Sequence, residues 1–298
     1  EAWHNWGWQE QFGYSEEVQR KIWADYEKVF HHLLPGIVNT IDPNRSYWPS
    51  SPSIGWGHEE ALLSGDMHYW GVWWGKEPFS VYEDKVGRFM SEYGFQAMPS
   101  YNTIQEFTLP EDRHLNSAVM QSHQKHPFGY EAIRLYMERN YRRPKDFRSY
   151  IYVSQLLQAR GIRTALEAHR RARPYCMGTL FWQLNDCWPV VSWSSVDYYG
   201  RWKALHYTAR TVFSDLVILP EEKGDSLVIK INNDNPEQVA AHLLVNLVTF
   251  KGDTLFTETK PVNLKESSCR KYHTLQTTAL LKNVSPQKVV LDLSFVRN

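Results

Sequence analysis

The residue best placed to do chemistry is a glutamate that follows an apolar pair. Residues 89–90, Phe-Met, have the composition of the end of a buried strand, and Glu92 comes two residues later, just before a Tyr-Gly pair. A buried strand that carries a carboxylate at its C-terminal end is how (β/α) barrels present catalytic groups. Short motifs often match by chance, so on this stretch alone a solvated or salt-bridged Glu92 is the more common interpretation.

A glycosidase built around Glu92 would need a second carboxylate on the other side of the scissile bond. Glu59 and Glu60 stand at the start of a predicted helix, where negative charge is favourable for a structural reason. Asp66 follows Gly65, so a role in a turn explains it better than catalysis. Spacing alone leaves the partner open among Glu1, Glu10, Glu59, Glu60, Asp66 and Glu77.

Other chemistries find little support in the chain. The histidines have no ligand spacing, and His31 and His32 point apart on a predicted helix, so we expect no metal site. No serine elbow, phosphate loop or Cys-His pair is present, so no cofactor is expected. Basic and acidic residues balance at 33 each, which argues against nucleic-acid and anionic-membrane partners. The 13 tryptophans exceed the usual need of a core this size and suit stacking on sugar rings.

The elements that would position Glu92 alternate between strands and helices. An amphipathic helix is predicted over residues 15–33, with Ser15 as its N-cap and Pro35-Gly36 ending it. The strongest helix runs over residues 146–170 and begins at Asp146. Strands separated by helical crossovers indicate an α/β fold with a parallel sheet. The remaining elements are predicted strands at 45–50, 65–74, 88–92 and 178–186, a helical turn at 80–86 and a helix at 202–213.

The pattern changes near residue 214. Residues 216–219, 227–231, 243–250 and 289–296 are short runs with period-two alternation, separated by turn sequences, which indicates a β-sandwich. We therefore predict two domains, residues 1–213 and 214–298. A complete eight-stranded barrel takes about 250 residues, whereas the first domain offers only four strand ends. It is predicted to be about half of a (β/α)8 TIM barrel, near strands 5–8.

Four segments give these elements a family resemblance. Residues 65–73, 91–96, 178–197 and 200–207 resemble the β-mannosidases of glycoside hydrolase family 2, and the similarity extends over essentially the whole chain. The resemblance implies a TIM-barrel portion followed by an immunoglobulin-like sandwich. It implies a retaining exo-glycosidase that releases terminal, non-reducing β-D-mannose by a two-glutamate double displacement.

The resemblance also assigns site residues. The glutamate of the family's Ser-Glu-Tyr-Gly motif is the nucleophile, which corresponds to Glu92. The family's acid/base glutamate precedes a Trp-rich stretch and a helix, which corresponds to Glu1; the Asn that normally precedes it is not in this sequence. Trp182 resembles the platform under the terminal sugar, with barrel core as its alternative. His68 either hydrogen-bonds near the nucleophile or fills the barrel interior. Further pocket walls are expected from Trp8, Trp56, Trp70 and Trp74.

Family members carry further domains before the barrel, so we expect this chain to lack the N-terminal domains and the first half-barrel of a parent protein. Alone it is expected to self-associate through unpaired edges and could lack activity. The expected partner is a carbohydrate: a β-mannoside, a manno-oligosaccharide or the core mannose of an N-glycan. A family 2 β-galactosidase, β-glucuronidase or exo-glucosaminidase, and a non-catalytic carbohydrate-binding protein, remain alternatives. The resemblance implies that the protein is periplasmic, secreted or lysosomal, and the residues themselves indicate no one of these compartments.

Overall fold

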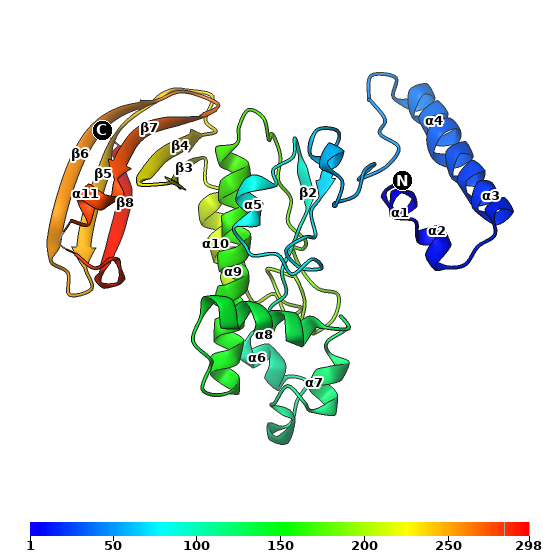
Figure 1. Cartoon of the computed structure of the whole chain (residues 1–298), viewed down its shortest axis with the longest axis horizontal. Coiled ribbons are helices and arrows are strands. Elements are labelled where there is room, and N and C mark those ends of the chain that lie inside the picture. Colours follow the sequence, from blue (N-terminus) through cyan, green and yellow to red (C-terminus); the bar gives the residue numbers. More distant parts are fainter. Residues whose placement is uncertain (283, 298) are drawn as a thin grey trace.

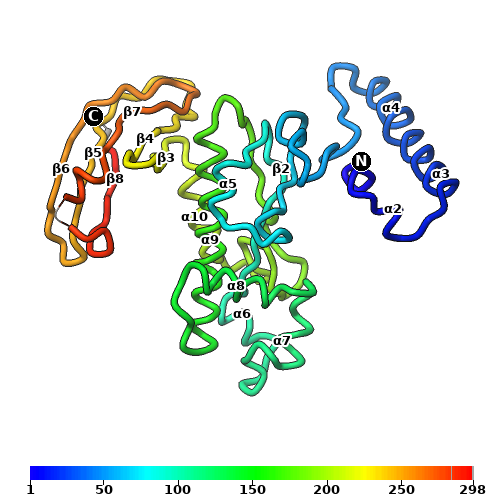
Figure 2. The backbone as a smooth tube through the Cα atoms, in the orientation of Figure 1, coloured from blue at the N-terminus to red at the C-terminus, as the bar shows by residue number. Residues whose placement is uncertain are grey.

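The computed structural model describes residues 1–282 and 284–297. An N-terminal helical arm, a central body and a C-terminal pair of β-sheets follow one another along the chain (Figure 1). The backbone tube shows the arm and the sheets on opposite sides of the body (Figure 2). The long helix α9, Phe147–Arg171, runs through the body on the side of the sheets.

The arm begins with two short helices, α1 (Ala2–Asn5) and α2 (Trp8–Gln11). Ser15 Oγ accepts a hydrogen bond from the Val18 amide at 3.4 Å, so Ser15 caps the next helix as predicted. The predicted end at Pro35 is wrong, because the helical path continues to residue 41. The π-helical turn before Pro35 is wider than an α-turn, and it accommodates a ring that has no amide to donate. The continuous path comprises α3 (Glu16–Glu27), η1 (Lys28–Leu33) and α4 (Leu34–Ile41).

Three parallel segments lie at the centre of the body. Strand β1, Met67–His68, pairs with β2, Met90–Glu92, and a single bridge joins Met90 to Thr179. The Trp182 amide extends this contact by donating to the Tyr93 carbonyl oxygen at 2.8 Å. The parallel direction agrees with the prediction. The (β/α)8 barrel portion stays a prediction, since β1, β2 and one bridge are too little to define it.

The predicted strands are longer than the observed ones. The predicted strand over 45–50 is wrong, because residues 45–50 form no strand; Pro49 lacks the amide hydrogen that a ladder requires. The predicted strand over 65–74 is reduced to β1, and the one over 178–186 to the bridge at Thr179. Aromatic composition therefore indicated where buried chain lies, but it overstated how much of it is regular strand.

Helices cover the parallel segments, and α9 has 13 buried residues, more than α8 with five. Asp146 accepts from the Ser149 amide at 2.7 Å, so the predicted N-cap is confirmed. A Cβ at Gly161 would overlap the ring of Phe79, so this glycine allows close packing in the middle of the helix. The other helices are η2 (Glu59–Leu62), α5 (Val81–Asp84), α6 (Tyr101–Gln105), η3 (Pro110–Asp112), α7 (Ala118–Ser122), α8 (Gly129–Asn140) and α10 (Ala204–Val212).

The C-terminal part contains two antiparallel three-stranded sheets. One has the order β3-β4-β7 and the other β6-β5-β8. Alternate residues along β5 are buried, and they form a core with Ile229, Ile231 and Leu264. The predicted β-sandwich is confirmed. Its strands are β3 (Leu216–Lys223), β4 (Ser226–Asn233), β5 (Val239–Thr249), β6 (Thr254–Leu264), β7 (Ser268–Gln276) and β8 (Val289–Arg297), with α11 (Thr277–Leu280) and η4 (Pro286–Lys288) between β7 and β8.

The sandwich is joined to the body by charged contacts at the end of α9. Arg170 and Arg173 both form ion pairs with Asp234, and the Arg170 side chain is only 7% exposed. Arg171 donates to the Pro220 carbonyl oxygen at 2.8 Å. A buried arginine needs such partners, since an unpaired buried charge is strongly destabilising. The division at residue 214 stays a prediction; β3 begins at Leu216.

Candidate active site

Glu92 lies at the end of β2 and is held by two neighbours from the β1 segment. His68 Nδ1 lies 2.8 Å from Glu92 Oε2, and Trp70 Nε1 donates to the same oxygen at 3.0 Å. Burial acts to raise the pKa of Glu92, but the hydrogen bonds from His68 and Trp70 and the charge of His68 lower it more. The pKa of Glu92 is therefore below its ordinary value, which keeps the carboxylate ionised at neutral pH.

Glu1 lies in the arm and faces a histidine from η1. Its Oε1 is 2.7 Å from His31 Nε2. Sequence reasoning set His31 aside because it is adjacent to His32 and has no ligand spacing. The contact arises only because α1 packs back toward η1, which no local pattern indicated.

One cavity of about 980 Å³ brings both carboxylates together. It also contains five of the six residues predicted to bind substrate, and Trp182 is the exception. Trp182 is 45% exposed and continues the segment beside Tyr93, outside the residues that line this cavity. The cavity is lined by Glu1, Ala2, Trp3, Trp6, Trp8, Gln11, Phe12, Ser50, Ser51, Pro52, Trp56, His68, Trp70, Trp74 and Glu92.

Two contacts hold the arm against the body at this cavity. Trp6 Nε1 donates to the Trp56 carbonyl oxygen at 3.1 Å, and Asn5 Nδ2 donates to the Ser53 carbonyl oxygen at 3.1 Å. A Cβ at Gly55 would overlap the Trp6 ring, so this glycine permits the close approach. Ser50 and Ser51 line the cavity and were missed as site residues. The Pro-Ser-Ser-Pro sequence at 49–52, which prevents a helix and places two hydroxyl groups in a loop, was the available signal.

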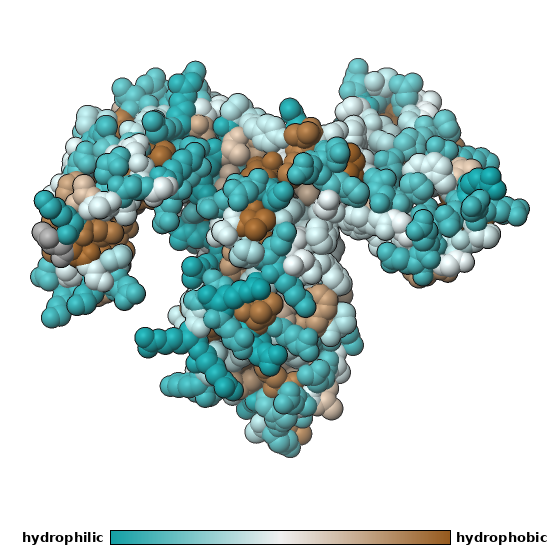
Figure 3. All heavy atoms as spheres, in the orientation of Figure 1, coloured by the Kyte–Doolittle hydropathy of each residue, from teal (hydrophilic) through white to brown (hydrophobic). Residues whose placement is uncertain are grey.

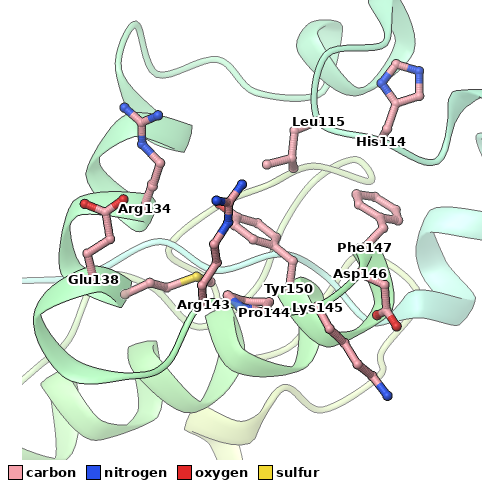
Figure 4. Close-up of a pocket in the computed structure, with 11 residues that line it drawn as sticks. His114, Leu115, Arg134, Glu138, Arg143, Pro144, Lys145, Asp146, Phe147 and Tyr150 are labelled. Atoms are coloured by element: carbon pink, nitrogen blue, oxygen red, sulfur yellow. The ribbon is translucent and has the colours of Figure 1, made fainter.

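A second pocket lies at the start of α9 and holds none of the predicted site residues. Its volume is about 460 Å³, and it is lined by charged side chains of both signs, among them Arg134, Glu138 and Arg143, and by the rings of Phe147 and Tyr150 (Figure 4). Helix N-termini attract anions, but the Asp146 carboxylate already accepts the Ser149 amide there. The pocket therefore lacks the free helix end that would define an anion site.

Two further properties concern the described residues only. Within residues 1–282 and 284–297, no group of three or more His, Cys, Asp or Glu side chains is arranged to hold a metal ion. In the same part of the chain, none of the helices combines the length and apolar character needed to cross a membrane.

Known proteins are similar to this chain in sequence. Residues 225–298 match the family described as a Mannosidase Ig/CBM-like domain. Over 198 residues the chain is 37% identical to β-mannosidase B of Emericella nidulans and 35% identical to that of Aspergillus niger. Each alignment covers 64% of this chain and 23% of the relative, so the chain spans about a quarter of the length of these proteins.

Solved structures extend the similarity. The crystal structure of a β-D-mannosidase from Dictyoglomus thermophilum matches 91% of this chain and 33% of its own, with a TM-score of 0.82 and 31% identity. The Amycolatopsis orientalis exo-chitosanase CsxA matches 74% of this chain and 30% of its own, with a TM-score of 0.57; at 15% identity it supports the fold alone.

A cavity that carries two carboxylates and is walled by tryptophan, together with these relatives, makes the chain similar to glycoside hydrolases. More narrowly, the chain is related to the β-mannosidases of glycoside hydrolase family 2, and the predicted resemblance is confirmed.

Proposed function

We propose that the protein to which this chain belongs is a retaining exo-glycosidase that releases terminal, non-reducing β-D-mannose from β-mannosides. The observation that carries the proposal is the cavity that Glu1 and Glu92 share, with Trp8, Trp56, Trp70 and Trp74 along its walls. Flat apolar rings suit the C–H faces of a sugar, and two carboxylates are what glycoside hydrolysis requires. The names of the relatives support mannose as the sugar.

In the first step, the ionised Glu92 attacks the anomeric carbon and forms a glycosyl ester, while the bond to the leaving oxygen breaks. The protonated carboxyl of Glu1 gives its proton to that oxygen. In the second step, Glu1 takes a proton from water, whose oxygen attacks the anomeric carbon and releases mannose and the Glu92 carboxylate. Retaining sites of this kind hold the two carboxyl groups about 5–5.5 Å apart.

The depressed pKa of Glu92 supports its assignment as the nucleophile, because only the ionised form can attack. Trp182 is proposed as the platform for the terminal sugar from the family resemblance alone; its side chain is 45% exposed and does not line the cavity that Glu1 and Glu92 share. The predicted sandwich would then serve as a support for the body, joined through Arg170, Arg173 and Asp234.

The test is a panel of aryl β-glycosides with the full-length enzyme and two of its variants. Glu92→Gln should reduce turnover of the mannoside by more than about 1,000-fold while leaving sugar binding intact. Glu111→Gln, which changes an exposed glutamate in η3, is the matched control. Rapid cleavage of the galactoside without cleavage of the mannoside would overturn the proposed substrate. Sugar binding without turnover by the unmodified enzyme would instead indicate a carbohydrate-binding protein.

The acid/base assignment needs its own experiment. Glu1→Ala should make the second step limit turnover of substrates with good leaving groups, because such groups depart without protonation whereas water still needs a base to attack the ester. Added azide should restore turnover and give a β-glycosyl azide, since azide attacks the ester without needing a base. If the variant is folded and azide does not restore turnover, Glu1 is not the acid/base. The assignment of Glu92 as the nucleophile would not be affected by that result.

A further inference from the structure

Asp66 lies behind His68, on the side of the ring opposite Glu92. Asp66 Oδ2 is 3.7 Å from His68 Nε2, while His68 Nδ1 is 2.8 Å from Glu92 Oε2. Two serines hold the Asp66 carboxylate in place. Ser51 Oγ donates to Oδ2 at 2.5 Å, and Ser91 Oγ, from β2 itself, donates to the same oxygen. One imidazole therefore stands between two carboxylates.

The hydrogen-bond roles in this row fix where protons are favoured. An ionised Glu92 can only accept, so His68 Nδ1 must carry a hydrogen. Ser51 gives its single proton to Asp66, so its oxygen, 3.4 Å from His68 Nε2, faces the ring with lone pairs. The oxygens that face Nε2 are Asp66 Oδ2, at 3.7 Å, and Ser51 Oγ. The titratable groups that face the ring are Asp66 and Glu92.

A role for Asp66 in the turn alone does not explain these contacts. Gly65, with φ of +69°, makes the turn, and the Asp66 side chain reaches away from it to Ser91 and Ser51. A residue that only shaped the turn would bond to its own neighbouring backbone. The sequence-based interpretation of Asp66 as a turn residue is therefore incomplete.

We propose that Asp66 is a positioning residue for the nucleophile: held by Ser51 and Ser91, it orients His68 so that the Nδ1 hydrogen is directed at Glu92. The inference rests on the proposed function, because it assigns Asp66 to the reaction of Glu92. Carboxylates that support histidines at metal sites typically account for about 10–100-fold in activity, and a loss in that range is expected here.

The first test is the pH profile of kcat/KM in the full-length enzyme carrying Asp66→Asn. If Asp66 acts through His68, the variant no longer holds the ring with Nδ1 toward Glu92. Glu92 then loses a hydrogen bond that lowers its pKa, and the acid limb moves to higher pH. If Asp66 were only a nearby charge, the acid limb would move to lower pH, because the negative charge of Asp66 raises the pKa of Glu92. A shift to lower pH, or no shift, overturns the inference.

Asp84→Asn, which changes an exposed aspartate at the end of α5, is the matched control and should leave the profile unchanged. Ser51→Ala and Ser91→Ala should each show part of the Asp66→Asn effect, and Asp66→Glu should recover part of it. A drop in thermal stability with an unchanged pH profile would reduce Asp66 to a structural role and overturn the inference.

The second test does not depend on turnover. Nitrogen-15 NMR of labelled His68 distinguishes a protonated Nδ1 from a bare one, and Asp66→Asn should change this state while Asp84→Asn does not. An unmodified enzyme that cleaves no glycoside would refute the proposed function, and the NMR result would still decide what Asp66 does to His68. Identical His68 spectra in the wild type and Asp66→Asn would overturn the inference.

Discussion

Gly94 packs against the backbone of Trp182 so closely that a Cβ at position 94 would overlap the Trp182 carbonyl oxygen. The same Cβ would lie 3.0 Å from Trp193 and 3.3 Å from Trp70. The glycine after the Glu92-Tyr93 pair is therefore required by packing. It lets the segment with the proposed sugar platform lie directly beside the segment with the proposed nucleophile.

Gly94→Ala is expected to destabilise the chain by about 1–3 kcal/mol, because an added methyl group must displace backbone as well as two indole rings. In the full-length enzyme it should also reduce kcat/KM. Gly36→Ala is the matched control, since a Cβ there meets nothing within 4 Å. Urea denaturation checks both variants, and equal stability of the two would contradict the packing argument.

Trp70→Phe isolates one hydrogen bond to Glu92. The variant keeps an aromatic ring but removes the Nε1–H that lies 3.0 Å from Oε2. This hydrogen bond lowers the pKa of Glu92, so its removal raises that pKa. The acid limb of kcat/KM, where Glu92 becomes protonated, should move to higher pH. Trp202→Phe, at a site outside the cavity, should not move it. A shift of the acid limb to lower pH would contradict the role given to Trp70.

Lys203 makes stability depend on pH. It is fully buried, donates to the carbonyl oxygens of Ala97 and Ser192 at 3.2 Å, and burial lowers its pKa from 10.5 to about 7. The unfolded chain binds more protons between these values, so this lysine makes stability rise as pH increases from about 7 to 10.5. Lys203→Met should flatten that rise in urea denaturation at several pH values. Parallel curves for wild type and variant would show that Lys203 does not titrate in this range.

Apolar side chains of the helical arm are exposed to solvent. None of the residues of α3, η1 or α4 is buried, and Leu33 and Ile41 are 56% and 78% exposed. On the face shown in Figure 3 the arm is mostly hydrophilic, as expected for one side of an amphipathic helix. We expect this chain alone to self-associate through the apolar side.

Light scattering over a concentration series checks this expectation. Leu33→Lys combined with Ile41→Lys should reduce the mass at high concentration, because each charge disrupts the apolar surface. Leu109→Lys, at an equally exposed leucine of the body, should not. A wild-type chain that stays monomeric throughout would show the prediction to be wrong.

The sequence alone determined features that depend on neighbouring residues. Ser15 and Asp146 were identified as helix caps, because a cap is set by the few residues that follow it. The alternating pattern after residue 214 indicated a sandwich, since each strand must bury every second side chain. The long motifs around Glu92 and Trp182 gave the family, which the relatives confirm.

Only the tertiary structure decided which side chains meet. It placed Glu1 and Glu92 in one cavity, left Trp182 outside the cavity lining, and paired Glu1 with His31. It also showed that the Asp66 carboxylate lies 3.7 Å from His68 and accepts hydrogen bonds from Ser51 and Ser91. Such contacts join residues that are far apart in the sequence. The helix and strand preferences of neighbouring residues do not determine how far apart two such segments lie. The physical reason is that long-range proximity depends on packing the whole core, whereas caps and alternation are settled within a few residues.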